Sequence, residues 1–145
     1  MKIFGIVNIL RDYCADNGIQ LLYGSSAYRN AIADRKKYEA GDLILLADFR
    51  AKSNYNMYKR IGVDFVGMLA LGRVREEKTR ASLNELYLQK YDRRLEELGD
   101  RLEQLLTDIT CPNDLDITST DWRIDLNKLD LNADFVYLTL TLRYE

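Results

Sequence analysis

The chain of 145 residues contains no histidine, a single proline and only two cysteines. Without histidine, neither a Ser-His nor a Cys-His nucleophilic site can form. The eight glycines are dispersed, and none precedes a Lys-Ser or Lys-Thr pair at the spacing of a phosphate-binding loop. Cys14 and Cys111 belong to no zinc-binding pattern. These absences argue against an enzyme and against a bound cofactor or metal.

No segment of the sequence has the length and apolarity of a membrane span or of a signal peptide. The apolar run at the N-terminus is interrupted by Asn8, Arg11 and Asp12. We therefore predict a protein that is made in the cytoplasm, is not bound to a membrane and has free thiols. A disulfide between Cys14 and Cys111 is the alternative in an oxidising compartment.

The composition is that of a globular chain. Hydrophobic residues make up 47% of the sequence and charged residues 30%, with a net charge of −2. These values give no overall footprint of a nucleic-acid-binding protein. The length predicts a single domain that spans residues 1–145.

Two amphipathic helices are predicted from apolar side chains at helical spacing. The first spans residues 2–16 and ends at Asn17-Gly18, because glycine suits the left-handed position after a helix. The second spans residues 82–109, about 40 Å at the usual helical rise. Its apolar stripe favours packing on a sheet over a free-standing coiled coil.

The ends of the long helix carry their own signals. The Ser82 hydroxyl can accept the N–H of Glu85, and the Glu85 carboxylate can reach back to Ser82, which is a capping box. Pro112 cannot continue a helix, so the helix should end near Ile109.

Strands are predicted from apolar runs and from alternation of apolar and polar residues, at residues 19–23, 42–49, 63–74, 114–118, 121–126 and 135–144. The tyrosine-bearing segment 50–62 is read as a long loop or as an extension of a hairpin. Gly67 and Gly72, inside a strand, indicate bulges or a close approach of backbones. Residues 132–134 are predicted to form the last turn.

This order of elements predicts an α+β fold. We expect an antiparallel or mixed β-sheet, with the N-terminal helix and the one long helix packed on one face. Three meandering strands and a closing hairpin would build such a sheet. The segment 24–37 is compatible with either a short helix or an ordered loop.

Four aspartates lie close together in the sequence before the last strand: Asp114, Asp116, Asp121 and Asp125. Clustered carboxylates can bind Mg²⁺ and support nuclease chemistry. The favoured alternative is that alternating Asp and Thr form the solvent-facing side of half-buried strands. We therefore expect no metal site here.

A second cluster combines tyrosines with basic residues between positions 50 and 60. Tyrosines among lysines and arginines can stack on nucleic-acid bases. They are equally typical of protein–protein contacts, where Tyr and Arg are enriched. The negative net charge of the chain favours the protein interface.

The order of elements resembles the tail-terminator and tail-completion proteins of long-tailed bacteriophages, with the related head–tail joining and neck proteins. The resemblance is carried by the N-terminal helix ending at Asn17-Gly18, the buried strand DLILLADF, the helix LNELYLQKYDRRLEELGDRLEQLL and the closing stretch LDLNADFVYLTLTLRYE. It spans most of the chain as a similarity of element order. The insert at 50–62 departs from the compact hairpin of that pattern.

The resemblance implies a structural virion protein that forms a ring, hexameric in this reading, at the head–tail axis. Its partners would be copies of itself, other neck or tail proteins and, without sequence specificity, passing DNA. It would reside in the host cytoplasm during assembly. The alternatives are a non-catalytic cytosolic accessory or binding module and, third, a metal-dependent nuclease.

Two segments at strand ends are the candidate interfaces, because a ring would place its contacts or its lumen there. The first is the tyrosine segment and the second the charged loop from 73 to 80; the alternative is that both are simply solvated. The candidate residues are Tyr55, Met57, Tyr58, Lys59, Arg60, Arg73, Arg75, Lys78 and Arg80.

Overall fold

The chain is represented by a computed structural model that describes residues 1–25, 37–74, 84–128 and 133–145; within 84–95 and 124–128 only the backbone is described. The predicted α+β fold with an N-terminal helix and one long helix is confirmed. The described elements are α1 (Gly5–Asp16), β1 (Ile19–Tyr23), β2 (Leu43–Asn56), β3 (Lys59–Val74), α3 (Asn84–Thr110), the 3-10 helix η2 (Cys111–Asn113), β4 (Leu115–Lys128) and β5 (Ala133–Tyr144).

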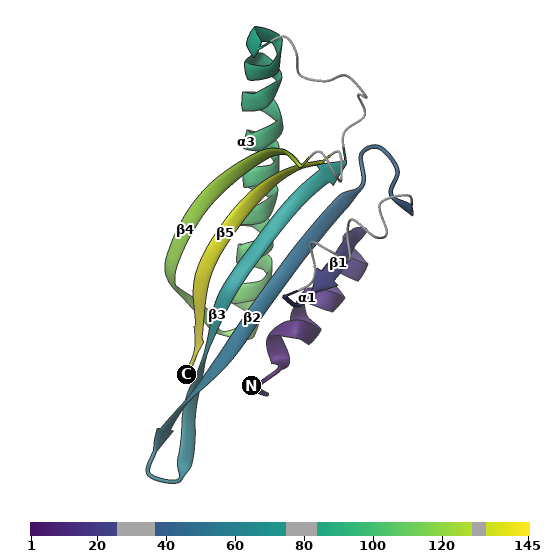
Figure 1. Cartoon of the computed structure of the whole chain (residues 1–145). Helices are drawn as coiled ribbons and strands as arrows, with labels where there is room; N and C mark the ends of the chain where they lie inside the picture. The colour runs from purple at the N-terminus through teal and green to yellow at the C-terminus, as the bar shows by residue number, and fades with distance from the viewer. Residues whose placement is uncertain (26–36, 75–83, 129–132) are drawn as a thin grey trace.

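The described strands form one mixed five-stranded sheet in the order β1-β2-β3-β5-β4 (Figure 1). β1 pairs with β2 in parallel, and every other neighbouring pair is antiparallel. The expected three-strand meander is therefore wrong at its first step, because a parallel pair needs a crossover rather than a tight turn. β5 lies between β3 and β4, which leaves β4 at one edge of the sheet.

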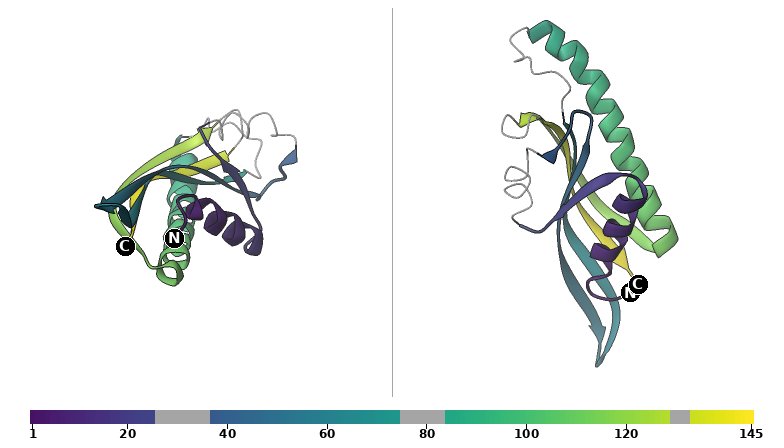
Figure 2. Two further views of the ribbon diagram at one scale, coloured as in Figure 1. Left: turned by 90° about the horizontal axis from the view of Figure 1, so that it is seen from below. Right: turned by 90° about the vertical axis from the view of Figure 1, so that its right-hand side faces the viewer.

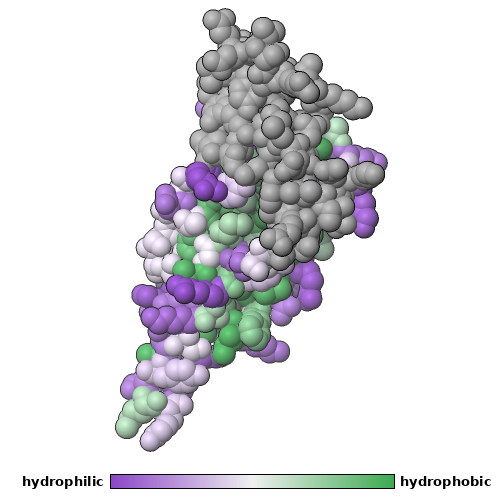
Figure 3. Space-filling model, in the orientation of Figure 1, coloured by the Kyte–Doolittle hydropathy of each residue, from purple (hydrophilic) through white to green (hydrophobic). Residues whose placement is uncertain are grey.

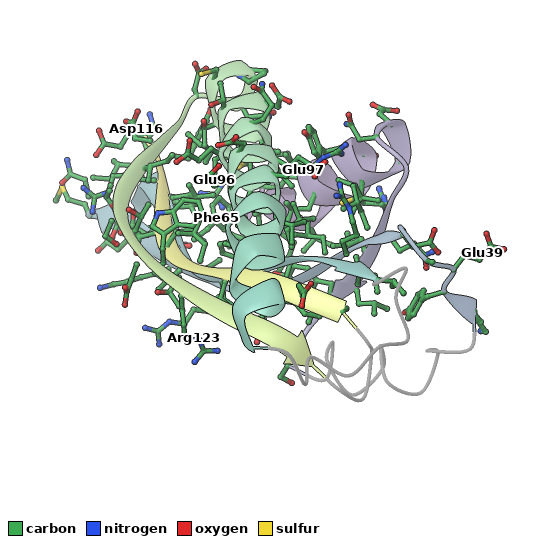
Figure 4. All side chains as sticks on the ribbon, turned by 90° about the horizontal axis from the view of Figure 1, so that it is seen from above. Glu39, Phe65, Glu96, Glu97, Asp116 and Arg123 are labelled. Carbon is green, nitrogen blue, oxygen red and sulfur yellow. The ribbon has the colours of Figure 1, made fainter. Side chains whose placement is uncertain are left out.

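Both helices pack on the same face of this sheet (Figure 2). Figure 4 places Phe65 between the sheet and α3, where its side chain is fully buried. The alternation of β5 explains this core, since every second side chain faces the helices. The core is made by Ile6, Leu10 and Cys14 of α1, Leu98, Leu102, Leu105, Leu106 and Ile109 of α3, and Leu45, Phe65, Leu69, Val136, Leu138, Leu140 and Leu142 of the sheet.

One polar contact joins the two helices. The Tyr13 hydroxyl donates a hydrogen bond to Oδ2 of Asp108 at 3.1 Å. Burial, together with that carboxylate, raises the pKa of Tyr13 to about 12. The hydroxyl therefore stays protonated and keeps donating over the whole physiological range.

The helix ends follow the sequence signals. Gly18 has φ of +66°, the left-handed conformation expected after α1. Pro112 lies in the 3-10 turn that ends α3, and the Asn113 amide donates to the Ile109 carbonyl at 2.9 Å. The predicted cap at Ser82 lies outside the described residues.

The C-terminal strands differ from the prediction in two respects. The segments 114–118 and 121–126 belong to one strand, β4, whose register shifts between Ile117 and Ser119. This bulge moves the apolar alternation from odd to even residue numbers. The predicted turn at 132–134 is wrong at its end, because Ala133 and Asp134 are buried in β5.

The two strand glycines mark close approaches rather than bulges, because the β2–β3 and β3–β5 registers run without interruption through them. A Cβ on Gly67 would overlap the Asp48 carbonyl and the Phe49 backbone, and one on Gly72 would overlap the Phe135 ring. Because glycine has no Cβ, Gly67 allows the β2 backbone, and Gly72 allows the Phe135 ring, to lie directly against β3.

Neither cysteine forms a disulfide. Cys14 is buried against α3 and the sheet, and burial raises the pKa of its thiol to about 11. Cys111 is exposed in η2. The prediction of free thiols is confirmed in this structure.

Candidate functional site

The most prominent feature of the surface is a hairpin formed by the ends of β2 and β3, here called the hairpin arm (residues 48–62). The last β2 residue that pairs with β1 is Ala47, and the first β3 residue that pairs with β5 is Val63. Between these points β2 and β3 pair only with each other. The hairpin arm therefore projects beyond the rest of the described chain, past both termini (Figure 1). Of the two sequence interpretations of this segment, the hairpin extension is confirmed.

The tip of the hairpin arm exposes large apolar side chains. Tyr58 is 98% exposed, Met57 87%, Tyr55 60% and Ile61 55%. In Figure 3 the tip is pale lavender with a light green part, while the body above it carries strongly hydrophilic patches. An exposed apolar cluster at the end of a projection indicates a contact site.

The turn at the tip carries backbone strain. Met57 has φ of +56°, in the left-handed region where glycine and asparagine are preferred, and it joins the pair Asn56–Lys59 together with Tyr58. A left-handed conformation costs a non-glycine residue about 1–2 kcal/mol. A methionine that is 87% exposed gains little packing within the chain that would offset this cost. Strain of this kind is typical of functional positions.

The hairpin arm is also strongly basic. It contains Arg50, Lys52, Lys59 and Arg60, and its one acidic residue is Asp48. The Arg60 guanidinium donates to the Met1 carbonyl at 2.7 Å, so this side chain links the hairpin arm to the N-terminal segment. The other three side chains belong to exposed residues.

An ion pair joins the base of the hairpin arm to β5. Nε of Arg143 donates to Oδ1 of Asp64 at 2.9 Å, and Nη2 donates to Oδ2 at 3.4 Å. The hydrogen bond from Arg143 lowers the pKa of Asp64 below its ordinary value. The pair therefore supports the β3–β5 pairing next to the hairpin arm while Asp64 is ionised.

We predict that Asp64→Asn lowers the free energy of unfolding by only about 1 kcal/mol at pH 7, because the Arg143 side chain is 42% exposed and solvent screens the ion pair. Because the folded pKa is depressed, this stabilisation is present above the ordinary Asp value of 3.8 and is lost as the pH falls through the folded value. Urea unfolding at pH 7 and at pH 2.5 measures the difference. Asp100→Asn, at an exposed site on α3, is the control; an equal loss at both pH values would contradict the role of the pair.

β2 has an open edge beyond β1. The Tyr23 hydroxyl accepts the N–H of Phe49 at 3.1 Å and donates to its carbonyl at 3.3 Å, so it closes the edge at that residue. Burial raises the pKa of this hydroxyl. Past Phe49 no described strand pairs with the outer side of β2. Since strand residues alternate, the next outward-facing backbone groups are those of Ala51 and Ser53.

The opposite edge of the sheet, β4, is open along its described length. Ile117 is 44% exposed and Trp122 39%, both on the helix side of this strand. On the other side, Asp116 and Arg123 point away from α3 (Figure 4), and the Arg123 guanidinium lies over the Tyr137 ring at 4.6 Å. Open edges with apolar side chains are templates for a further strand.

The four aspartates of the sequence do not converge as a metal centre. Asp114 precedes β4 in a left-handed conformation, and Asp116 and Asp121 are exposed on β4 with the row of Ser119 between them. The side chain of Asp125 lies outside the described part. Among the described side chains, no three His, Cys, Asp or Glu residues are placed to hold a metal ion.

The face of the sheet opposite the helices has one broad, shallow hollow between the base of the hairpin arm and β4. Its charged lining consists of Asp48, Arg50 and Asp121, and the rest is formed mainly by Thr139, Thr141, Val66 and Met68. The hollow contains no histidine or cysteine and is widely open.

The predicted interface residues fall into three groups. Tyr55, Met57, Tyr58 and Lys59 lie together on the tip, with Arg60 just behind it. Arg73 is not on a free loop, since its guanidinium forms a bidentate ion pair with Glu97 of α3 at 3.0 Å. This contact lowers the pKa of Glu97. Arg75, Lys78 and Arg80 lie outside the described residues.

The sequence matches no family model and no curated protein. Neither α1 nor the described α3 is long and apolar enough to cross a membrane. The site is therefore interpreted from its own geometry.

Proposed function

We propose that this chain is a non-catalytic structural protein that associates with copies of itself, with the tip of the hairpin arm as a principal contact. The observation that carries the proposal is the exposure of Tyr55, Met57, Tyr58 and Ile61 on a projecting, strained hairpin. Burying one such side chain in a contact stabilises it by about 1.5–3 kcal/mol. This gain is available only to an assembly, because the arm reaches beyond the chain's own core.

The particular assembly that we propose is the ring at the head–tail axis of a tailed bacteriophage, as tail terminator or as head–tail connector. The support is the resemblance in element order together with the arm and the two open sheet edges. Contacts between different surfaces of identical subunits form a closed ring when the rotation from one subunit to the next brings the last subunit back to the first. Other neck or tail proteins would be its partners, and passing DNA would be contacted without sequence specificity.

Two other functions lead to different observations. An accessory or binding module with the same fold would be a monomer or a dimer that binds an unrelated partner, and the mass of the purified protein in solution separates it from a ring. A metal-dependent nuclease would digest DNA when Mg²⁺ or Mn²⁺ is added, and it would lose this activity in an Asp114→Asn/Asp116→Asn variant. The scattered positions of the described aspartates do not favour the nuclease.

We predict that Met57→Ser/Tyr58→Ser weakens self-association by at least about tenfold in Kd, because it removes two apolar contact residues. The free energy of unfolding should change by less than about 0.5 kcal/mol, since both side chains are exposed. Sedimentation velocity over a concentration series measures the association, and urea unfolding measures the stability.

Asp16→Ser, an exposed change on α1, is the matched control and should leave both measurements as in the wild type. Unchanged association of the tip variant would exclude the tip as a contact between copies.

A further inference from the structure

We propose that successive copies join head to tail by pairing the open start of β4 in one copy with the open edge of β2 in the next. The inference rests on the proposed self-association and names the surfaces that carry it. Seven large apolar side chains are exposed in the described part of the chain, four on the hairpin arm and two on β4. The exposed apolar surface is thus concentrated on the hairpin arm and on β4, each of which has an edge that no described strand pairs with.

A row of alternating charges crosses the whole sheet between these edges. Lys52 lies opposite Asp64, Asp64 opposite Arg143, and Arg143 opposite Asp116. The row begins with a cation at the open edge of β2 and ends with an anion at the open edge of β4. Placing Asp116 of one copy beside Lys52 of the next continues the alternation without a break, since opposite charges on facing strands attract.

The surroundings of the row have the same complementarity. The hairpin arm carries four basic side chains and one acidic side chain, Asp48, while residues 114–125 carry four aspartates and one arginine. Such a pair of surfaces attracts across copies and repels like against like. It therefore favours contact between different surfaces over a symmetric dimer.

The backbone groups also match at this register. The backbone N–H and C=O groups of Ala51 and Ser53 point to the open edge, as the Tyr23–Phe49 contact indicates. Those of Lys52 therefore point to β3, where Lys52 pairs with Asp64. Following the alternation through β3 and β5, Asp116 faces β5. Leu115 and Ile117 then face outward on β4. In an antiparallel contact with Asp116 beside Lys52, Ala51 meets Ile117 and Ser53 meets Leu115 as hydrogen-bonded pairs.

Both ends of this contact are defined by the chain. Tyr23 closes the edge of β2 at Phe49, and the bulge after Ile117 bends β4 before it would reach Tyr23, the last β1 residue of the next copy. The pairing is thus limited to a short segment. It would cover the half-exposed Ile117, which would lie beside Ala51 on the helix side.

Disulfide trapping tests the register directly. In a Cys111→Ser background, Lys52→Cys/Asp116→Cys should give a ladder of covalent oligomers on mild oxidation. Facing residues of antiparallel strands lie within disulfide reach, whereas positions 52 and 116 of one copy are separated by three strand spacings of about 4.8 Å each. An equimolar mixture of the two single-cysteine variants should give a covalent dimer and no ladder.

The controls separate this inference from the proposed function. Lys52→Cys with Ile117→Cys, one residue out of register and on the other face, should give at least tenfold less product. A covalent dimer from Lys52→Cys alone would show a symmetric contact and overturn the head-to-tail pairing. If sedimentation shows oligomers but no disulfide forms between positions 52 and 116, the edge pairing is wrong, whereas the proposed self-association is supported. A wild type that stays monomeric under the trapping conditions would overturn the pairing, while the location of the protein in the particle would still test the proposed function.

Discussion

Leu102→Ala is expected to lower the free energy of unfolding by about 2–5 kcal/mol. Leu102 is fully buried in the face of α3 that packs on the sheet, together with Leu98 and Leu105. Alanine removes the apolar contacts and leaves a cavity that neighbouring side chains fill only in part. Chemical denaturation with urea measures the change.

Glu103→Ala is the matched control, because Glu103 is the next residue of the same helix and is exposed. It should change the stability by less than about 0.5 kcal/mol. If both variants unfold at the wild-type midpoint, α3 does not pack on the sheet through this stripe, and the described core is wrong.

Gly67→Ala is expected to destabilise the sheet by about 1–3 kcal/mol or more, although it adds a single methyl group. The new Cβ would overlap the Asp48 carbonyl and lie 2.7 Å from Cα of Phe49. These are backbone atoms of the paired strand, so they cannot turn aside as a flexible side chain does. We expect the β2–β3 pairing to open locally, which hydrogen exchange of the β2 amides would detect.

Gly99→Ala makes the same substitution at another site, and there we expect it to increase the stability. Gly99 lies within α3, and a Cβ there would meet no atom within 4 Å. Alanine in a helix interior is favoured over glycine by about 0.5–1 kcal/mol, so this variant should be more stable than the wild type. Equal effects of the two substitutions would contradict the close strand approach at Gly67.

The positions of the elements follow from local patterns, which explains why so many could be predicted. The helix ending at Gly18 and the strand at Ile19–Tyr23 match the structure, because each depends on neighbouring residues. The side-chain alternation of β5 likewise identifies the face that packs on the helices. The buried segment 42–49 was recognised, but β2 continues to Asn56 because polar and aromatic residues can also form a ladder with a partner strand.

The pairing of the strands depends on contacts between residues far apart in the sequence, and no local pattern specifies it. The parallel β1–β2 pair and the position of β5 between β3 and β4 are of this kind. The bulge in β4 likewise depends on the partner strand. Its sign in the sequence is that apolar residues occupy odd positions up to Ile117 and even positions from Trp122.

The candidate site was predictable where composition alone marks it. Tyrosines among basic residues identified the tip, whereas Arg73 was assigned to a free loop because its partner Glu97 is 24 residues away. The sequence does not predict the open edge of β4. Ile117 and Trp122 alternate with polar residues in the same way as the buried Leu138 of β5, so their pattern does not reveal their exposure. Only the sheet order shows which strand lacks an outer neighbour.

The proposed function places the protein in a tailed phage particle, so its location in purified particles of such a phage is the most direct test. Immunogold labelling with an antibody against this chain, read by electron microscopy, makes the measurement. We predict a single labelled site per particle at the head–tail junction or at the head-proximal end of the tail. Particles that carry no label there, or a protein found only outside them, would contradict the proposal.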